Sequence, residues 1–121
     1  MKHYHAHVYF TPEQLNQAPR FAEALVNTVP MLELAGIARR PVGPHPLPMI
    51  EFHLTELSIE SLKSALADLP EIRSTLIHED TGDDYKDHTE GAQWVGEKLA
   101  LDFQFFELIK QDPSRMIHKP K

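Results

Sequence analysis

Residues 3–10, "HYHAHVYF", alternate between two kinds of side chain, and this alternation predicts a β-strand. Because successive residues of a strand face opposite sides of a sheet, one side of this strand is apolar and the other carries imidazoles. The apolar side consists of Tyr4, Ala6, Val8 and Phe10, and the other side of His3, His5, His7 and Tyr9. A short strand thus presents several histidines in one direction.

The segment "MIEFHL" at residues 49–54 has the same alternation and predicts a second strand of this kind. Its apolar positions are Ile50, Phe52 and Leu54, and its other positions are Met49, Glu51 and His53. Two further strands are predicted, a weakly patterned one within residues 31–39 and another at residues 72–78, which ends at His78.

Two helices are predicted between these strands. Thr11, Pro12 and Gln14 form a capping-box start, with proline at the first helical position. Pro19 would cost a helix interior about 3 kcal/mol, so we expect a short first turn and a second start near Pro19 that runs to about Asn27. The second helix is expected over residues 58–70. Ser58 caps it, Pro70 ends it, and its apolar stripe is Ile59, Leu62, Leu66 and Leu69.

The predicted order is strand, helix, strand, strand, helix, strand. This order is typical of the α+β class, specifically a ferredoxin-like βαββαβ two-layer sandwich with both helices on one face of an antiparallel sheet. We expect a short helix or turn around residues 92–95 and then an extra C-terminal strand with alternating Leu99, Leu101, Phe103 and Phe105. The length of 121 residues fits a single domain, which we place at residues 1–110, followed by a polar tail at residues 111–121.

Composition and charge narrow the possible functions. The formal net charge is -6, which argues against nucleic acid as a partner, because a phosphate-binding face needs clustered Lys and Arg. The chain has no cysteine, which excludes disulfides, thiolate nucleophiles, zinc fingers and iron–sulfur clusters. No apolar run approaches the roughly 20 residues that span a bilayer, and the N-terminus has no apolar signal core, so we expect a cytoplasmic protein without a membrane partner.

The eight histidines are the unusual feature, because histidine is the commonest metal ligand and the acid–base residue of neutral pH. In a ferredoxin-like sheet the strands at residues 3–10 and 49–54 are central neighbours, so their polar stripes should lie side by side on the face away from the helices. A carboxylate among imidazoles is the chemistry of a 2-His-1-carboxylate site, which holds non-haem Fe(II). The residues expected on this face are His5, His7, Tyr9, Glu51 and His53, joined by His78 from the fourth strand and covered by His45 and His88.

Simpler interpretations exist for the same residues. His3, His53 and His118, taken singly, are most simply solvated surface residues. The histidine-bearing face as a whole could instead be a dimer interface with satisfied polar groups. The acidic run Glu79, Asp80, Asp83, Asp84 and Asp87 lacks the spacing of an EF-hand loop and is most simply a solvated turn.

Several segments together resemble the DOPA 4,5-dioxygenase family: "YHAHVYF", "GPHP", "HEDTGDDYKDHT", "AQWVG" and "LALD". The resemblance extends from about residue 4 to residue 102. It implies a ferredoxin-like fold and extradiol cleavage of a catechol such as DOPA with O2 at a non-haem Fe(II). The chain departs from fungal relatives at Glu79, where a proline is often found, and in its polar extension after Phe106.

The resemblance also implies roles for individual residues. The positions that match the histidine motifs of the family are His5, His7, His45, His78 and His88. We expect the metal ligands to be His5, His7, His78 and Glu51, with His45 as a further candidate. His88, His45 and Asp87 are expected in acid–base or histidine-orienting roles, and Tyr9 and Trp94 either line the substrate site or belong to the core.

The expected cofactor is Fe(II), with O2 as co-substrate. Zinc or nickel can replace iron in purified protein, because both bind such sites more tightly. The alternative function is a non-enzymatic, dimeric ferredoxin-like binding module whose histidine-bearing face is a subunit or ligand interface. A third possibility is a metal-free reaction in the same cleft. A homodimer is expected under the first two interpretations.

Overall fold

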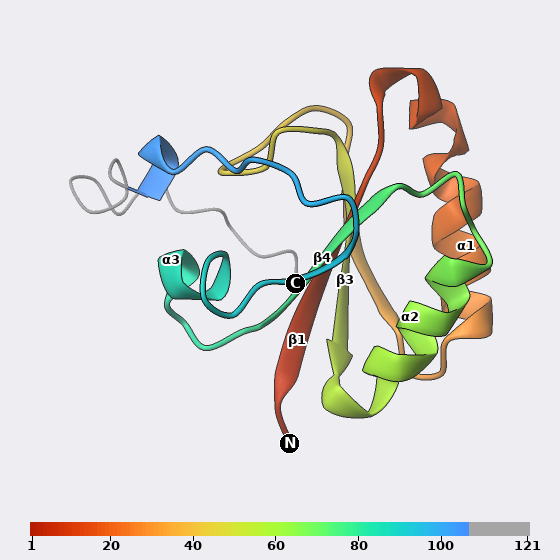
Figure 1. Ribbon diagram of the computed structural model, residues 1–121. Helices are drawn as coiled ribbons and strands as arrows, with labels where there is room; N and C mark the ends of the chain where they lie inside the picture. The colour runs from red at the N-terminus through yellow and green to blue at the C-terminus, as the bar shows by residue number, and fades with distance from the viewer. Residues whose placement is uncertain (107–121) are drawn as a thin grey trace.

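The computed structural model describes residues 1–106 and consists of one antiparallel sheet with elements on both faces (Figure 1). The strand order is β2-β3-β1-β4-β5. The strands are β1 (His3–Tyr9), β2 (Glu33–Ala38), β3 (Met49–Thr55), β4 (Ser74–Glu79) and β5 (Gln93–Gly96). The helices are α1 (Ala18–Thr28), α2 (Ile59–Ala67) and α3 (Asp84–Asp87), with 3-10 helices at Pro12–Gln17 and Glu56–Ser58.

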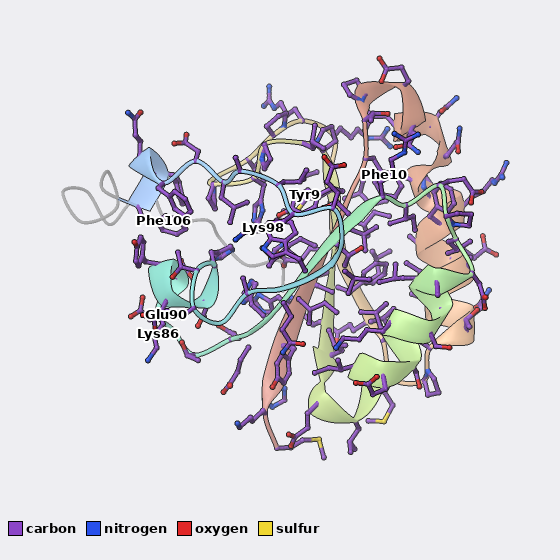
Figure 2. All side chains as sticks on the ribbon, in the orientation of Figure 1. Tyr9, Phe10, Lys86, Glu90, Lys98 and Phe106 are labelled. Atoms are coloured by element: carbon purple, nitrogen blue, oxygen red, sulfur yellow. The ribbon has the colours of Figure 1, made fainter. Side chains whose placement is uncertain are left out.

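The first four strands and two helices have the predicted ferredoxin-like arrangement. The two helices α1 and α2 lie together on one face of the sheet (Figure 1). Val8, Ile50, Phe52 and Ile77 point into this layer and are fully buried. Phe10 lies on the helix side, whereas its neighbour Tyr9 lies on the opposite side (Figure 2).

The other face is covered by segments of the same chain. The loop at residues 39–48, helix α3 and the segment after β5 all lie on this side (Figure 1). A smaller apolar cluster forms here around Tyr9, Met49, Leu76 and Leu101. The backbone N–H of Asp102 donates to the carbonyl of Pro44, which ties two of the covering segments together.

The central position of β1 brings three strands into one polar stripe. Its His5 is paired with His53 of β3 on one side and with His78 of β4 on the other. His7 is paired with Glu51 of β3. The prediction that the strands at residues 3–10 and 49–54 are neighbours in the sheet is therefore confirmed.

The region after β4 was predicted wrongly. The extra strand is β5, at Gln93–Gly96, where we expected a helix or turn, and the short helix lies earlier, at Asp84–Asp87. The chain leaves the sheet at Gly96, which has a positive φ of 84° and whose added Cβ would lie 2.3 Å from the carbonyl oxygen of Arg73. Only glycine fits at this position. Residues 99–105 form no strand, and the backbone N–H of Asp102 donates instead to Pro44 in the loop at residues 39–48.

The start of the second helix also differs. A 3-10 turn precedes α2, and the hydroxyl of Ser58 makes no cap but donates to the carbonyl of Pro30. The capping box of Thr11 and Gln14 and the restart at Ala18–Thr28 agree with the prediction. Residues 107–110 of the expected domain and the expected polar tail at 111–121, which includes His118, lie outside the described residues.

Candidate functional site

Five histidines from four segments of the chain are buried together on the sheet face opposite α1 and α2. They are His5 and His7 of β1, His45 of the proline-rich loop, His78 of β4 and His88, which follows α3. The ring centroids of His7 and His45 are 4.3 Å apart, and those of His78 and His88 are 4.4 Å apart. The structure therefore brings together all five histidines of the predicted site.

Two of these rings are oriented by backbone carbonyls. The Nδ1 of His78 lies 3.0 Å from the carbonyl oxygen of Glu79, and the Nδ1 of His88 lies 2.7 Å from that of Asp84. A carbonyl oxygen only accepts hydrogen bonds, so in both rings Nδ1 is assigned the proton. In each neutral ring, Nε2 then carries a lone pair, which is the form that binds a metal.

The same reasoning applies to His7. Its Nδ1 lies 3.0 Å from the sulfur of Met49 and 3.7 Å from a carboxylate oxygen of Glu51, and both atoms are acceptors. This leaves a lone pair on Nε2, which faces the Nε2 of His78 at 3.1 Å. Two lone pairs at this distance repel each other, and a shared proton or cation between them removes the repulsion.

Two more ring nitrogens lack a partner. The Nε2 atoms of His45 and His88 are buried, and neither has a hydrogen-bond partner within residues 1–106. A buried polar atom without a partner costs about 1–3 kcal/mol. A bound cation or the hydroxyl of a bound ligand would satisfy these atoms. Because neutral imidazole nitrogens are good ligands for iron, zinc and nickel, the histidines of the cavity fit a metal.

The cavity that these histidines line has the size of an ion. Its volume is about 20 Å³, enough for one water molecule or one metal ion. Two sets of three rings each have ligand atoms within 4.8 Å of one another. One set is His5, His7 and His78, and the other is His7, His45 and His88.

The electrostatics favour neutral rings. Burial lowers the pKa of His7 well below its usual value, and the surrounding imidazoles lower it further. Burial likewise lowers the pKa of His45 to about 3 and that of His78 to about 4, and it lowers the pKa of His88. Near neutral pH all four rings are therefore available as ligands or as proton acceptors.

Glu51 lies at the edge of the cavity and is buried. One of its oxygens is 2.9 Å from the Nε2 of His53, whose ring stacks on that of His5. Glu51, His5 and His53 form a third group whose ligand atoms lie within 4.8 Å. His53, which we interpreted as a solvated surface residue, is thus half-buried and bound to the carboxylate.

The remaining predicted residues, Tyr9, Trp94 and Asp87, are not among the residues that line the histidine cavity. The Tyr9 hydroxyl is 2.7 Å from the Nδ1 of His45, and its ring stacks on Trp94. Trp94 lines a second cavity, which also includes His88. The carboxylate of Asp87 is buried and accepts hydrogen bonds from the backbone N–H and the hydroxyl of Thr81.

Sequence reasoning missed part of the wall of the histidine cavity. Pro44, Asp84, Phe105 and Phe106 also line it. The ring of Phe106 is 5.6 Å from that of His88, and Figure 2 shows it beside α3. Phe105 was assigned to a strand from its alternation with Phe103, and no other pattern in the sequence indicates its position.

The fold and the histidine site together define a class of small α+β proteins with a candidate metal centre on the face of a ferredoxin-like sheet that lies opposite the two helices. The sequence model of the Dopa 4,5-dioxygenase family matches residues 4–105. The chain therefore belongs to this family, as its motifs predict.

Two individual proteins are similar to it. A protein of Botryotinia fuckeliana described as an "Uncharacterized 21.2 kDa protein" is 31% identical over 119 residues, a match that covers 87% of this chain and 63% of the relative. The chain thus spans less than two thirds of the length of that relative. A crystal structure of "a putative dioxygenase" from Nostoc punctiforme superposes with a TM-score of 0.78 at 28% identity, covering 90% of this chain and 94% of the other.

Within residues 1–106, no helix combines the length and the apolar character needed to cross a bilayer.

Proposed function

We propose that this protein is a dioxygenase that cleaves the ring of a catechol with O2 in the extradiol manner at a non-haem Fe(II). The observation that carries the proposal is the convergence of unpartnered or mutually facing imidazole Nε2 atoms on a cavity large enough for one ion. Membership of the Dopa 4,5-dioxygenase family and the Nostoc structure support the same chemistry.

His5, His7 and His78 would hold the metal, with Glu51 next to His7 as the carboxylate of the site. When bound there, Fe(II) would supply binding positions for the diol and for O2 and a path for electrons between them. The pairing of Nδ1 with acceptors in His7 and His78 fixes their rings and leaves the Nε2 atoms free to act as ligands.

His45 and His88 have the properties of proton acceptors. Each presents a buried, unpartnered Nε2 to the site, and the pKa of each is lowered, so both are neutral near pH 7. A catechol must lose a proton to bind as an anion, and a neutral imidazole within hydrogen-bond reach accepts it. The Tyr9 hydroxyl holds the His45 ring for this role.

The covering segments add apolar side chains to the wall of the site, namely Pro44, Phe105 and Phe106. Apolar surroundings strengthen the electrostatic interactions between the charged and polar groups of a site.

The test is anaerobic loading of the purified protein with Fe(II), followed by measurement of O2 uptake with a catechol. We expect uptake of one O2 per diol and a ring-opened product that is coloured in alkali, whereas the zinc-loaded protein serves as the inactive control. Elemental analysis should find one metal ion per chain. Protein that binds no metal at micromolar concentration would overturn the proposal.

The alternative of a binding module with the histidine face as its subunit interface is disfavoured by the covering of that face. His7, His45 and His78 are buried within the chain, so these three rings offer no surface to a second subunit. Homodimerisation itself stays a prediction, which sedimentation velocity would test. Cytoplasmic localisation likewise stays a prediction, which cell fractionation would test.

A further inference from the structure

A further cavity, called the outer cavity below, shares His5 with the histidine cavity. Its volume is about 330 Å³, and its walls include His3, Glu33, His53 and Asp80. Imidazole and carboxylate groups are the usual ligands of zinc and nickel. No lysine or arginine is among the described residues that line the outer cavity. It therefore combines metal-binding side chains with carboxylates that no permanently cationic side chain of its wall offsets.

A group of ligand atoms lies at the boundary of the outer cavity. The ligand atoms of His5, Glu51 and His53 all lie within 4.8 Å of one another. Glu51 Oε2 is 2.9 Å from the Nε2 of His53, and the rings of His5 and His53 stack with centroids 4.3 Å apart. Bonds from zinc to histidine nitrogen or carboxylate oxygen are about 2.0–2.2 Å long, so two ligands of one ion lie about 2.9 Å apart at a right angle. The Glu51–His53 pair already has this separation, and the three residues can share one ion after a shift well under about 1 Å.

The two oxygens of Glu51 face different residues. Oε1 lies 3.7 Å from the Nδ1 of His7 in the histidine cavity, whereas Oε2 lies 2.9 Å from the Nε2 of His53. A second carboxylate oxygen, from Asp80, lies 3.4 Å from the Nε2 of His5. Negative charge beside imidazole ligands favours the binding of a cation. Glu51 thus connects the histidine cavity with the group at the outer cavity.

We infer that His5, Glu51 and His53 form a second, outer site for a divalent cation of the zinc or nickel type, with Asp80 as additional negative charge. Because His5 and Glu51 also belong to the proposed iron site, an ion in the outer site withdraws ligands from the inner one. Binding at either site therefore weakens binding at the other. Excess zinc or nickel is thus an inhibitor of iron loading. The inference goes beyond the proposed function, since it concerns a second ion, and it is measured without turnover.

The outer ion should be the more weakly bound of the two. The side chain of His53 is 25% exposed, whereas that of His7 in the histidine cavity is 3% exposed. Water competes for an ion whose ligands are accessible, and the outer ion also has to share two ligands. Protein dialysed against metal-free buffer should therefore keep only the inner ion, and the outer site should fill in excess metal.

The test is a measurement of zinc stoichiometry. Metal-free full-length protein is dialysed to equilibrium at pH 7.5 against increasing concentrations of zinc chloride, and zinc per chain is determined by elemental analysis. We expect the wild type to reach a plateau at one zinc and then rise to two.

Variants of His53 remove the outer site only. His53→Ala should saturate at one zinc with the first step unchanged, and His53→Gln, which keeps a polar side chain beside Glu51, should behave in the same way. Circular dichroism checks that both variants are folded. His3→Ala removes a histidine that lines the outer cavity but does not belong to the ligand group, and it should still bind two.

Iron retention tests the coupling of the two sites. Iron-loaded protein is dialysed anaerobically against increasing zinc, and the iron that remains is measured. His53→Ala should need about tenfold more zinc than the wild type to lose half of its iron, a ratio within the usual range of coupling between sites. Equal zinc concentrations for the two proteins would mean direct replacement at the inner site and would reject the coupling.

Saturation of the wild type at a single zinc that persists in His53→Ala would overturn the outer site. A second zinc that persists in both His53 variants would also overturn it, because that ion would be bound elsewhere. Failure of the proposed function looks different: two zinc ions would bind, the second dependent on His53, but the iron-loaded protein would take up no O2 with a catechol.

Discussion

Both faces of the central sheet are buried, but one packs apolar side chains and the other packs histidines. On the side of α1 and α2, Val8, Phe52 and Ile77 pack against apolar helix residues. One position away on the same strands, His7 and His78 face the opposite side. The strands thus build an apolar core and a polar site from adjacent residues.

The two layers contribute differently to stability. The helix layer gains from the removal of apolar surface from water. The histidine layer contains ring nitrogens without partners, at His45 and His88, and a repulsive contact between His7 and His78, all of which oppose folding in the absence of a ligand. Native proteins leave few buried polar groups unsatisfied, so the arrangement indicates a function that requires these atoms.

Phe52→Ala in the helix layer should have the largest effect on stability. Phe52 is fully buried, so truncation should lower the free energy of unfolding by about 3–5 kcal/mol, measured by urea denaturation. Phe52→Leu retains most of the volume and should cost clearly less. A loss below about 1 kcal/mol for the alanine variant would contradict the assignment of this face as the core.

His7→Ala on the opposite face should weaken metal binding strongly but change stability little. His7 belongs to both histidine sets, so its removal should weaken metal binding by more than about 100-fold, measured by competition with a chelator. The free energy of unfolding of the metal-free protein should change by less than about 1 kcal/mol, because the variant also removes a repulsive contact. His3→Ala, an exposed histidine of the same strand, is the control and should retain the metal affinity.

The pH dependence of stability should come from the histidine layer. The folded-state pKa values of His78 and His45, about 4 and about 3, are lower than the value of about 6.5 in an unfolded chain. Below about pH 6.5 the unfolded state therefore binds more protons than the folded state, so the free energy of unfolding of the metal-free protein should decrease as pH falls. The expected slope is about 1.4 kcal/mol per pH unit for each histidine that stays neutral in the folded state. Urea denaturation in a chelating buffer measures this slope.

His78→Gln serves as the matched variant for this experiment. It should reduce the slope of the unfolding free energy against pH by the contribution of one histidine, and the other buried histidines should account for the slope that remains. A stability that is constant between about pH 7 and pH 5 would contradict the neutral, buried state of these rings.

Tyr9→Phe should have the smallest effect of these substitutions, and that effect should be on turnover. The substitution removes the hydroxyl that lies 2.7 Å from the Nδ1 of His45 but keeps the stacking on Trp94. We expect turnover of the iron-loaded protein to fall by about tenfold, the lower end for the loss of a group that orients a histidine, with little change in stability. Unchanged turnover would show that His45 does not depend on this hydroxyl.

Much of the sheet and part of the site follow from the sequence. The period of two in β1 and β3 assigned Ala6 and Phe52 to one face and His7 and Glu51 to the other, and the alternation of strands and helices predicted their pairing. The pattern failed after β4, where the alternation at residues 99–105 predicted a strand. The turn at Gly96 depends on its close approach to Arg73, a contact that no local pattern indicates.

The sequence by itself determined which residues of the strands share a face, because side-chain direction in a strand follows directly from position. Only the tertiary structure decided that His45 and His88, from loops without periodicity, close over that face with Nε2 directed inward. It also decided that Phe106 joins the histidine cavity and that Lys98 and Trp94 share the neighbouring one. The position of a loop depends on long-range contacts, here the hydrogen bond from Asp102 to Pro44, and these form only when the whole chain has folded.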